Sequence, residues 1–233
     1  MNILAIDTSN ELLGVAVLNS ETVLGEISTN FKKDHSARLM PAIVSLLEHL
    51  EMKPEHINKV VVAHGPGSYT GVRIGVTTAK TIAWALKIPI VGVSSLEALS
   101  YNGCFFNGII CPFFDARRKR VFTGLYKTNG SQMISIEKDT NLSMDDWLKK
   151  VAKRNEKILF LSPHLAFYNE RIEQILGDLA VIPQYIEHTT RAANVGYAGM
   201  YKNSVDVHML NPNYLRLAEA EAKWLKENEG SSI

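Results

Sequence analysis

The stretch VVAHGPGSYTGVRIGVTTAKTIAWAL, from Val61 to Leu86, predicts the fold and raises the first question about function. It begins as an apolar, β-rich run, passes through a glycine-rich loop at residues 65–71, and continues as a helix. A strand, a glycine-rich loop and a helix in this order also build the phosphate loops of nucleotide-binding proteins. The loop therefore either holds a phosphate or only makes a tight turn.

The loop fits neither of the named phosphate motifs. A Walker loop ends in Gly-Lys-Ser/Thr, whereas no lysine follows Gly71, and the spacing from Gly65 is one residue too long. The third glycine comes too late for the dinucleotide fingerprint that Gly65 and Gly67 begin. What remains is the attraction of amides in the first helical turn for an anion, with Arg73 nearby. Asp7, Gly65, Gly67, Gly71 and Arg73 are therefore weak candidates for binding a nucleotide or an anion, and an architectural loop is the alternative.

Two long helices are expected in the first half of the chain. Residues 39–50 place apolar side chains at helical spacing on one face, and Pro41 is expected to kink this helix. The helix after Gly71 is apolar or small over about two thirds of its circumference, more than a one-sided surface helix needs. This broad apolar surface is either buried within the fold or presents one stripe to another chain.

The order of strands and helices is expected to occur twice along the chain. Three strands, a helix, a strand and a helix are predicted within the first 102 residues, and the same order restarts afterwards. The repeat predicts an α/β protein of two related βββαβα lobes, residues 1–102 and 103–217. A last helix at 218–228 is a candidate for packing back on the first lobe.

The composition is that of a globular protein without a strong electrostatic field. The chain has 233 residues, of which 46% are hydrophobic and 21% charged, and a net charge of +1. Overall charge therefore recruits neither nucleic acid nor a membrane. We expect no signal peptide and no membrane span. Cys104 and Cys111 are too few for a disulfide scaffold or a four-cysteine zinc site, so reduced, buried thiols and a cytoplasmic location are expected.

Five segments of the chain form a recognisable set. They are ILAIDTS at 3–9, HSARLMPAI at 35–43, GPGSYTGVRIG at 65–75, DARRKRVF at 115–122 and PNYLR at 212–216. Together they resemble the bacterial TsaB (YeaZ) family, densely in the first lobe and sparsely in the second. The resemblance implies the actin/Hsp70-like ASKHA fold, which agrees with two related lobes.

The resemblance also implies a role in forming N6-threonylcarbamoyladenosine on tRNA. In that pathway TsaD transfers the threonylcarbamoyl group, TsaB is its non-catalytic activating partner, and the small ATPase TsaE joins them. Family members also form homodimers when TsaD is absent. The chain itself is expected to need no cofactor: ATP or ADP would bind only at a surface shared with a partner, and tRNA would be reached through the complex.

The family's contact surface uses the two long helices that begin near His35 and Gly71. The candidate contacts with a partner are His35, Leu39, Ile43, Leu46, Leu50, Gly71, Gly75, Val76, Thr78 and Ala83. Asp34 precedes His35, but neighbouring residues on a helix do not face each other. A helix-start or interface role is therefore expected for His35 rather than an acid–base pair.

The histidines bear on whether the chain is a partner or a transferase. TsaD-type proteins carry a His-x-x-x-His pair, two imidazoles one helical turn apart that hold a metal ion. None of the 7 histidines is followed by another at that spacing, so no catalytic residue and no metal ligand is expected. The alternative is a weak ATPase or small-molecule kinase of the same fold, with Asp7 at the nucleotide and magnesium. A self-associating structural protein is the third possibility.

The segment Arg117–Arg120 consists of consecutive cations. It is interpreted either as a contact with tRNA phosphates or as the solvated edge of a hairpin.

Overall fold

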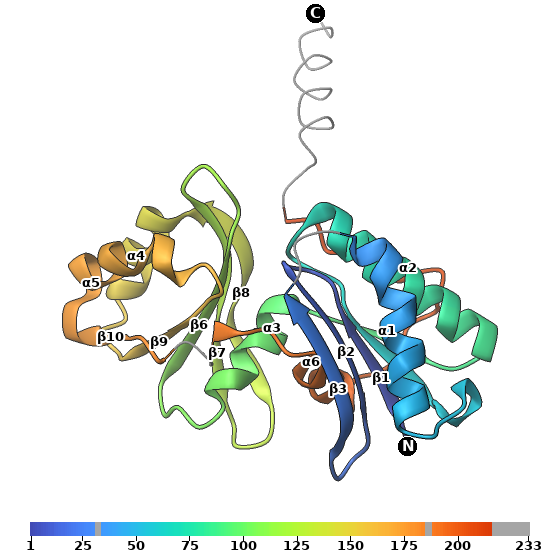
Figure 1. Cartoon of the computed structure of the whole chain (residues 1–233). Coiled ribbons are helices and arrows are strands. Elements are labelled where there is room, and N and C mark those ends of the chain that lie inside the picture. The colour runs from blue at the N-terminus through green and yellow to red at the C-terminus, as the bar shows by residue number, and fades with distance from the viewer. Residues whose placement is uncertain (31–33, 185–187, 216–233) are drawn as a thin grey trace, which may run out of the picture.

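Two five-stranded sheets form the centres of the two lobes in the computed structural model, which describes residues 1–30, 34–184 and 188–215 (Figure 1). The first sheet contains β1 (Ile3–Asp7), β2 (Leu12–Leu18), β3 (Val23–Asn30), β4 (Lys59–Ala63) and β5 (Ile90–Val93). The second contains β6 (Ile109–Asp115), β7 (Arg120–Thr128), β8 (Met133–Ser143), β9 (Ile158–Leu161) and β10 (Ala180–Val181). Their orders, β3-β2-β1-β4-β5 and β8-β7-β6-β9-β10, are the same. Each sheet is an antiparallel meander continued by parallel strands.

The helices follow the order that the sequence predicts. They are α1 (His35–His49), α2 (Tyr69–Leu86), α3 (Ser95–Ser100), α4 (Met144–Ala152), α5 (Asn169–Leu176) and α6 (Ala192–Gly199). The expected succession of three strands, helix, strand and helix is confirmed in each half. α1 runs through Pro41 without interruption. The division of the chain into lobes at residue 102 stays a prediction.

Each sheet is covered by helices on both faces, which is why its central strands are almost entirely apolar. Successive side chains of a strand point to opposite faces. In β1, Leu4 and Ile6 accordingly pack with α1 and α2, whereas Ile3 and Ala5 pack with α6. The second sheet has the same construction, with α4 and α5 on one face and α3 on the other.

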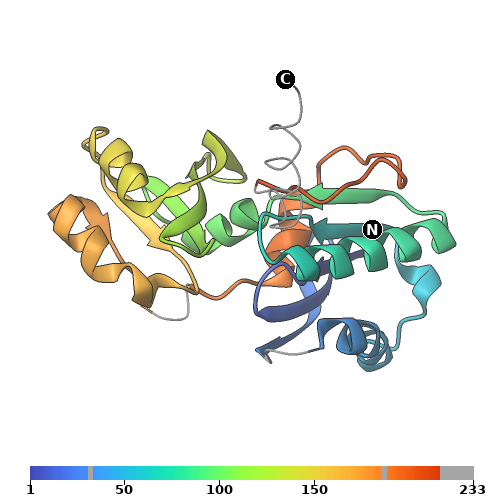
Figure 2. The same ribbon diagram turned by 90° about the horizontal axis from the view of Figure 1, so that it is seen from above.

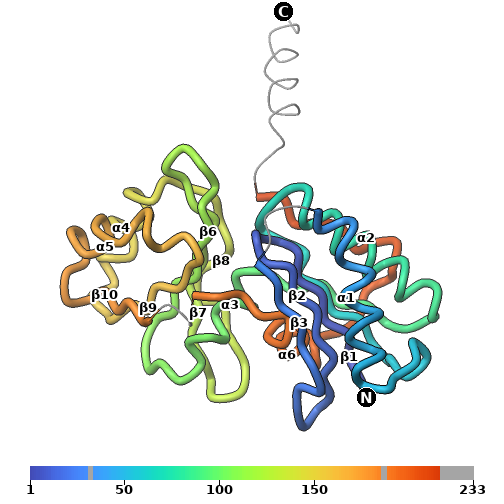
Figure 3. Tube along the Cα trace, viewed as in Figure 1, coloured from blue at the N-terminus to red at the C-terminus, as the bar shows by residue number. Residues whose placement is uncertain are grey.

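The last helix of each half packs on the sheet of the other half (Figure 3). Leu96 and Leu99 of α3 lie in one cluster with Ile110 and Phe114 of β6. α6 packs against β1, β2 and β4. The layers therefore run α1 and α2, first sheet, α6 and α3, second sheet, α4 and α5 (Figure 1). α6 thus falls in the expected second-lobe range 103–217 by sequence but packs on the first sheet, because an apolar helical pattern predicts burial without saying on which sheet.

Two charged side chains of the first sheet hold the ends of α6. The carboxylate of Glu26 accepts hydrogen bonds from Arg191 Nη2 at 2.7 Å and from the amide of Ala193 at 3.0 Å. Lys59, which is 8% exposed, donates from Nζ to the carbonyl oxygen of Met200 at 2.8 Å. An anion at the N-terminus and a cation at the C-terminus both complement the helix dipole. These contacts place α6 on the first sheet.

Replacing Lys59 by Met should lower the free energy of unfolding by about 2 kcal/mol, because the last carbonyls of α6 lose a charged donor in a buried place. Lys127→Met is the matched control. Its Nζ pairs with Glu156 at 2.7 Å, but the two side chains are 41% and 46% exposed, so less than about 1 kcal/mol should be lost. Urea unfolding of both variants checks this, and equal losses would contradict the role given to Lys59.

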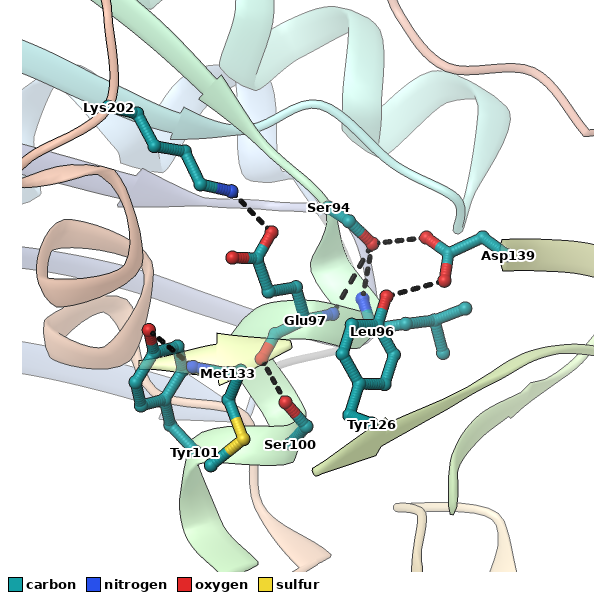
Figure 4. Close-up of polar contacts among 9 residues, drawn as sticks. All are labelled: Ser94, Leu96, Glu97, Ser100, Tyr101, Tyr126, Met133, Asp139 and Lys202. Atoms are coloured by element: carbon teal, nitrogen blue, oxygen red, sulfur yellow. Dashed lines mark hydrogen bonds and ion pairs between the residues drawn. The ribbon is translucent and has the colours of Figure 1, made fainter. Parts of the chain in front are cut away.

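A polar network joins α3 to the second sheet and to the segment after α6 (Figure 4). Ser94 caps α3 by accepting from the amides of Leu96 and Glu97, and its hydroxyl donates to Asp139 of β8 at 2.5 Å. The hydroxyl of Tyr126 donates to the other oxygen of Asp139, also at 2.5 Å. Burial raises the pKa of both Asp139 and Glu97. The network therefore ties the start of α3 to the second sheet.

The expectations for the cysteines, for membrane spans and for a last helix differ in outcome. Both cysteines are free; Cys111 is buried and its pKa is raised to about 11 by burial, whereas Cys104 is only half-buried. Within the described ranges, none of the helices combines the length and the apolar character that crossing a bilayer requires. The helix expected at 218–228 lies outside the described residues.

Candidate functional site

A cleft of about 900 Å³ lies between the lobes, where β1 and β4 of the first sheet and β6 of the second reach their carboxyl ends. Ligands of open α/β sheets bind at such edges. The first lobe contributes Asn10, Glu11, Asp34, His35, Ser68 and Tyr69, and the second contributes Phe114, Asp115, Arg117, His164 and Phe167. Asn213 and Tyr214 complete the wall.

Asp7 fixes the turn after β1 and is not among the described residues that line the cleft. It is 1% exposed, and its carboxylate accepts hydrogen bonds from the amide and the hydroxyl of Ser9, at 2.9 and 2.7 Å. Burial raises the pKa of Asp7, and the bonds from Ser9 oppose that shift. This geometry favours the interpretation of Asp7 as a turn residue over that of a nucleotide ligand.

The glycine-rich loop packs directly on this turn. The amide of Ser68 donates to the carbonyl oxygen of Ser9 at 2.7 Å, and the hydroxyl of Thr8 donates to the carbonyl oxygen of Gly71 at 2.7 Å. A Cβ atom on Gly71 would lie less than 3.0 Å from the backbone oxygen of Thr8, and one on Gly67 would lie as close to the backbone oxygen of Ser9. Both positions therefore need glycine because the two backbones touch.

Two amides in the first turn of α2 are bonded within the chain. The helix begins at Tyr69, two residues earlier than the sequence suggests, with Ser68 as its N-cap. The amide of Gly71 donates to the Ser68 hydroxyl at 3.3 Å, and that of Val72 donates to the Ser68 carbonyl at 2.8 Å. The Arg73 guanidinium lies 4.0 Å from the centre of the Tyr69 ring. The loop is thus a poor fit to a phosphate, and the architectural interpretation is favoured.

The candidate partner contacts divide into buried and accessible residues. Leu39, Ile43, Leu46, Val76 and Ala83 are at most 4% exposed and belong to the core between the first sheet and its two helices. This burial, which Gly71 and Gly75 share, disfavours them as contacts with a partner, and contact through them stays a prediction. His35, Leu50 and Thr78 are half-buried and stay predictions. The apolar circumference of α2 is therefore mostly explained by burial within the fold.

The basic segment forms the turn between β6 and β7. Arg117, Arg118 and Lys119 are exposed, as expected for the edge of a hairpin. Arg120 differs, because it is half-buried and its guanidinium donates to the side-chain and backbone oxygens of Asn141, each at 2.6 Å. The turn therefore has three exposed cations, not four, and one of them, Arg117, lines the cleft.

Aromatic side chains on both walls of the cleft were not anticipated as site residues. Tyr69 and Tyr214 stack with ring centres 4.8 Å apart, and Arg73 Nε donates to the Tyr214 hydroxyl at 2.7 Å. Across the cleft, Phe167 is 75% exposed and stacks on His164. Tyr214 lies in the recognisable segment 212–216, but no pattern in the sequence distinguishes Phe167.

Comparison with known proteins agrees with this architecture. The family model described as "TsaD: tRNA N6-adenosine threonylcarbamoyltransferase" matches residues 22–228. A Bacillus subtilis protein named tRNA threonylcarbamoyladenosine biosynthesis protein TsaB is 48% identical over 229 residues, covering 98% of this chain and 100% of that protein. The Escherichia coli protein of the same name is 33% identical over 132 residues, 54% of this chain and 55% of that protein.

A solved structure of YeaZ from Pseudomonas aeruginosa has the same fold. It matches with a TM-score of 0.77 at 22% identity and covers 92% of this chain and 99% of that chain. The likeness confirms the ASKHA-type α/β fold expected for the two related lobes. Because the chain is 48% identical to the Bacillus protein over 98% of its length and has the same fold as YeaZ, it belongs to the TsaB (YeaZ) family of tRNA threonylcarbamoyladenosine biosynthesis proteins.

Proposed function

We propose that the chain is the non-catalytic activating partner of the TsaD transferase in the threonylcarbamoylation of tRNA adenosine. The observation that carries the choice of partner over catalyst is the close packing of the glycine-rich loop on the turn after β1. A working phosphate loop directs its backbone amides at the ligand. Here the amides of Ser68 and Gly71 donate within the chain, and the turn at Thr8 and Ser9 occupies the space beside the glycines.

The residues that could hold a metal ion also favour a partner over a catalyst. The sequence has no His-x-x-x-His pair, which TsaD-type proteins are expected to use for a metal ion. Across the part of the chain that the structure describes, no three His, Cys, Asp or Glu side chains are grouped so that they could hold a metal. The transfer step is therefore assigned to the partner.

We place the partner on the exposed face of α1. Its outward stripe, the α1 stripe, consists of Ala37, Met40, Pro41 and Val44, all apolar and all exposed. Met40 and Val44 are 45% and 47% exposed. α1 and α2 together form the outer layer of the first lobe (Figure 2). Because its side chains are exposed, the stripe is accessible to another protein. An apolar stripe of this kind fits a helix of a partner packed against it.

The remaining parts of the proposal follow from the family. A second copy of the chain would use the same stripe when TsaD is absent, and TsaE would join the complex of TsaB and TsaD. ATP or ADP would bind at a surface shared with a partner. The complex would act in the cytoplasm, where tRNA is modified.

Reconstitution tests the proposal. The chain, given tRNA and preformed threonylcarbamoyl-adenylate, should form no modified adenosine by nucleoside mass spectrometry. TsaD and TsaE should form it only when the chain is added. Product from the chain alone would identify it as an enzyme, and full activity of TsaD and TsaE without it would remove the activating role.

A further inference from the structure

The turn between β6 and β7 holds three consecutive cations in an unfavourable backbone conformation. Arg117, Arg118 and Lys119 have φ angles of 62°, 55° and 58°. The left-handed region costs a side-chain-bearing residue about 1–2 kcal/mol, and glycine or asparagine usually occupies it. Hydrogen bonds from Ala116 N to Arg120 O at 2.8 Å and from Met144 N to Lys119 O at 3.0 Å hold the turn. Strain retained at exposed charged residues points to a function for those charges.

Carboxylates lie on both sides of this turn. Asp115 accepts from the amide of Arg117 at 3.2 Å and from the Tyr168 hydroxyl at 2.6 Å. Asp145, on the outer side of the turn, is held by two hydrogen bonds from Arg171. Glu11 and Asp34 line the cleft from the first lobe. On the second lobe Arg117 thus lines the cleft, and Arg118 and Lys119 follow it on the same exposed turn.

The aromatic walls provide faces on which a base can stack. Phe167 is 75% exposed and lies nearly parallel to the His164 ring, at 21° and 6.4 Å between centres. Burial lowers the pKa of His164, so the ring is neutral at pH 7. Tyr69 and Tyr214 are 37% and 39% exposed on the other side. Cations for phosphates beside aromatic faces for bases are the combination by which proteins bind unpaired nucleic acid.

We propose that the cleft binds an unpaired segment of RNA, with successive phosphates on the turn Arg117–Lys119 and a base stacked on Phe167. Three adjacent cations match a run of phosphates, whereas a single phosphate needs one of them. An acidic peptide would supply the charge, but only a nucleic acid carries a planar base beside every charged unit. The identity of the RNA as tRNA rests on the proposed function; the contact itself rests on the cleft.

Glycine substitutions separate the charge from the strain. In Arg117→Gly/Lys119→Gly the backbone is relieved, so the melting temperature should stay or rise, while a fluorescent tRNA transcript should bind the purified chain about tenfold more weakly. The salt slope, log Kd against log[KCl], should fall by about 1.4, because each phosphate contact to a single strand contributes about 0.7. Anisotropy titrations at several KCl concentrations measure both. Unchanged affinity and slope would overturn the proposal.

Lys87→Gly is the matched control. Lys87 is also an exposed cation in the left-handed region, with φ of 55°, but it follows the far end of α2. Removing it should leave both the affinity for tRNA and the salt slope unchanged. An equal loss in this variant would show that the effect is general electrostatics and would overturn the assignment to the cleft.

The stacking contact has its own test. Phe167→Ala should weaken binding about fivefold or more, whereas Phe105→Ala, which removes a ring that is 98% exposed and is not among the cleft's lining residues, should not. AMP or ATP that displaces the tRNA at micromolar concentration would mark the cleft as a mononucleotide site and overturn the proposal. A chain that binds no RNA yet activates TsaD fully would refute this inference and leave the proposed function standing. A chain that binds RNA but fails to activate TsaD would refute the proposed function and leave this inference standing.

Discussion

Gly71→Ala should lower the free energy of unfolding by at least about 3 kcal/mol, and no side-chain change at position 8 should restore it. The added Cβ would lie less than 3.0 Å from the backbone oxygen of Thr8. Overpacking usually costs about 1–3 kcal/mol, and the loss is larger where neither side can yield. Here the obstacle is main chain at the end of a buried strand, so the turn and the start of α2 would have to separate.

Gly75→Ala is the informative comparison with Gly71→Ala, because the Cβ added at position 75 would meet the side-chain hydroxyl of Thr8 and not the backbone of Thr8. That oxygen is less than 3.0 Å away, whereas the next neighbour, Val62 Cγ2, is at 3.6 Å. Thr8→Ala removes the hydroxyl, at the cost of its hydrogen bond to the Gly71 carbonyl. The double variant Thr8→Ala/Gly75→Ala should therefore be more stable than Gly75→Ala alone. Thr8→Ala/Gly71→Ala should be no more stable than Gly71→Ala.

Midpoints of urea unfolding, read with the slope m, decide between these outcomes. A Gly71→Ala variant within about 1 kcal/mol of the parent would show that the loop can move away from the turn. The amides at the start of α2 would then be accessible to a phosphate, and the kinase or ATPase alternative would regain its main support. Calorimetric titration of that variant with ATP and magnesium would follow.

Val44→Asp should abolish the complex with TsaD while leaving the chain folded. Val44 is 47% exposed, so a carboxylate there stays in water in the free chain. In a complex that covers the α1 stripe the same charge would be buried without a partner, which costs several kcal/mol. A loss of about 3 kcal/mol corresponds to more than a hundredfold weaker binding. Analytical gel filtration and titration calorimetry measure the loss.

Two further variants give this experiment its controls. Ile134→Asp places the same charge on a side chain of equal exposure, 48%, on β8 of the second lobe, and should leave the complex intact. Leu46→Asp, on the buried face of α1, should unfold the first lobe, because Leu46 is 4% exposed within the core. Full binding by Val44→Asp with an unchanged melting temperature would remove the α1 stripe from the interface.

Much of the fold is predictable because it depends on local patterns. Alternation and apolar runs locate β1, β4 and β6, and the spacing in residues 39–50 locates α1. Ser143 before an acidic first turn marks the start of α4, where its hydroxyl accepts from the amide of Asp146. Elements of this kind are specified by residues a few positions apart, so the sequence shows them directly.

The order of the elements, the repeat of two lobes and the family can all be predicted from local patterns and motifs. Only the folded chain shows that α6 crosses to the first sheet, held by Glu26 and Lys59. The same is true of the close approach of the backbone at residues 8 and 9 to the glycines at 67 and 71. The folded chain also shows which stripe of α1 is open and that Phe167 stands exposed in the cleft. The physical reason is range: periodicity and capping act within a few residues, whereas burial, close backbone approach and the walls of a cleft depend on segments that meet only when the chain is folded.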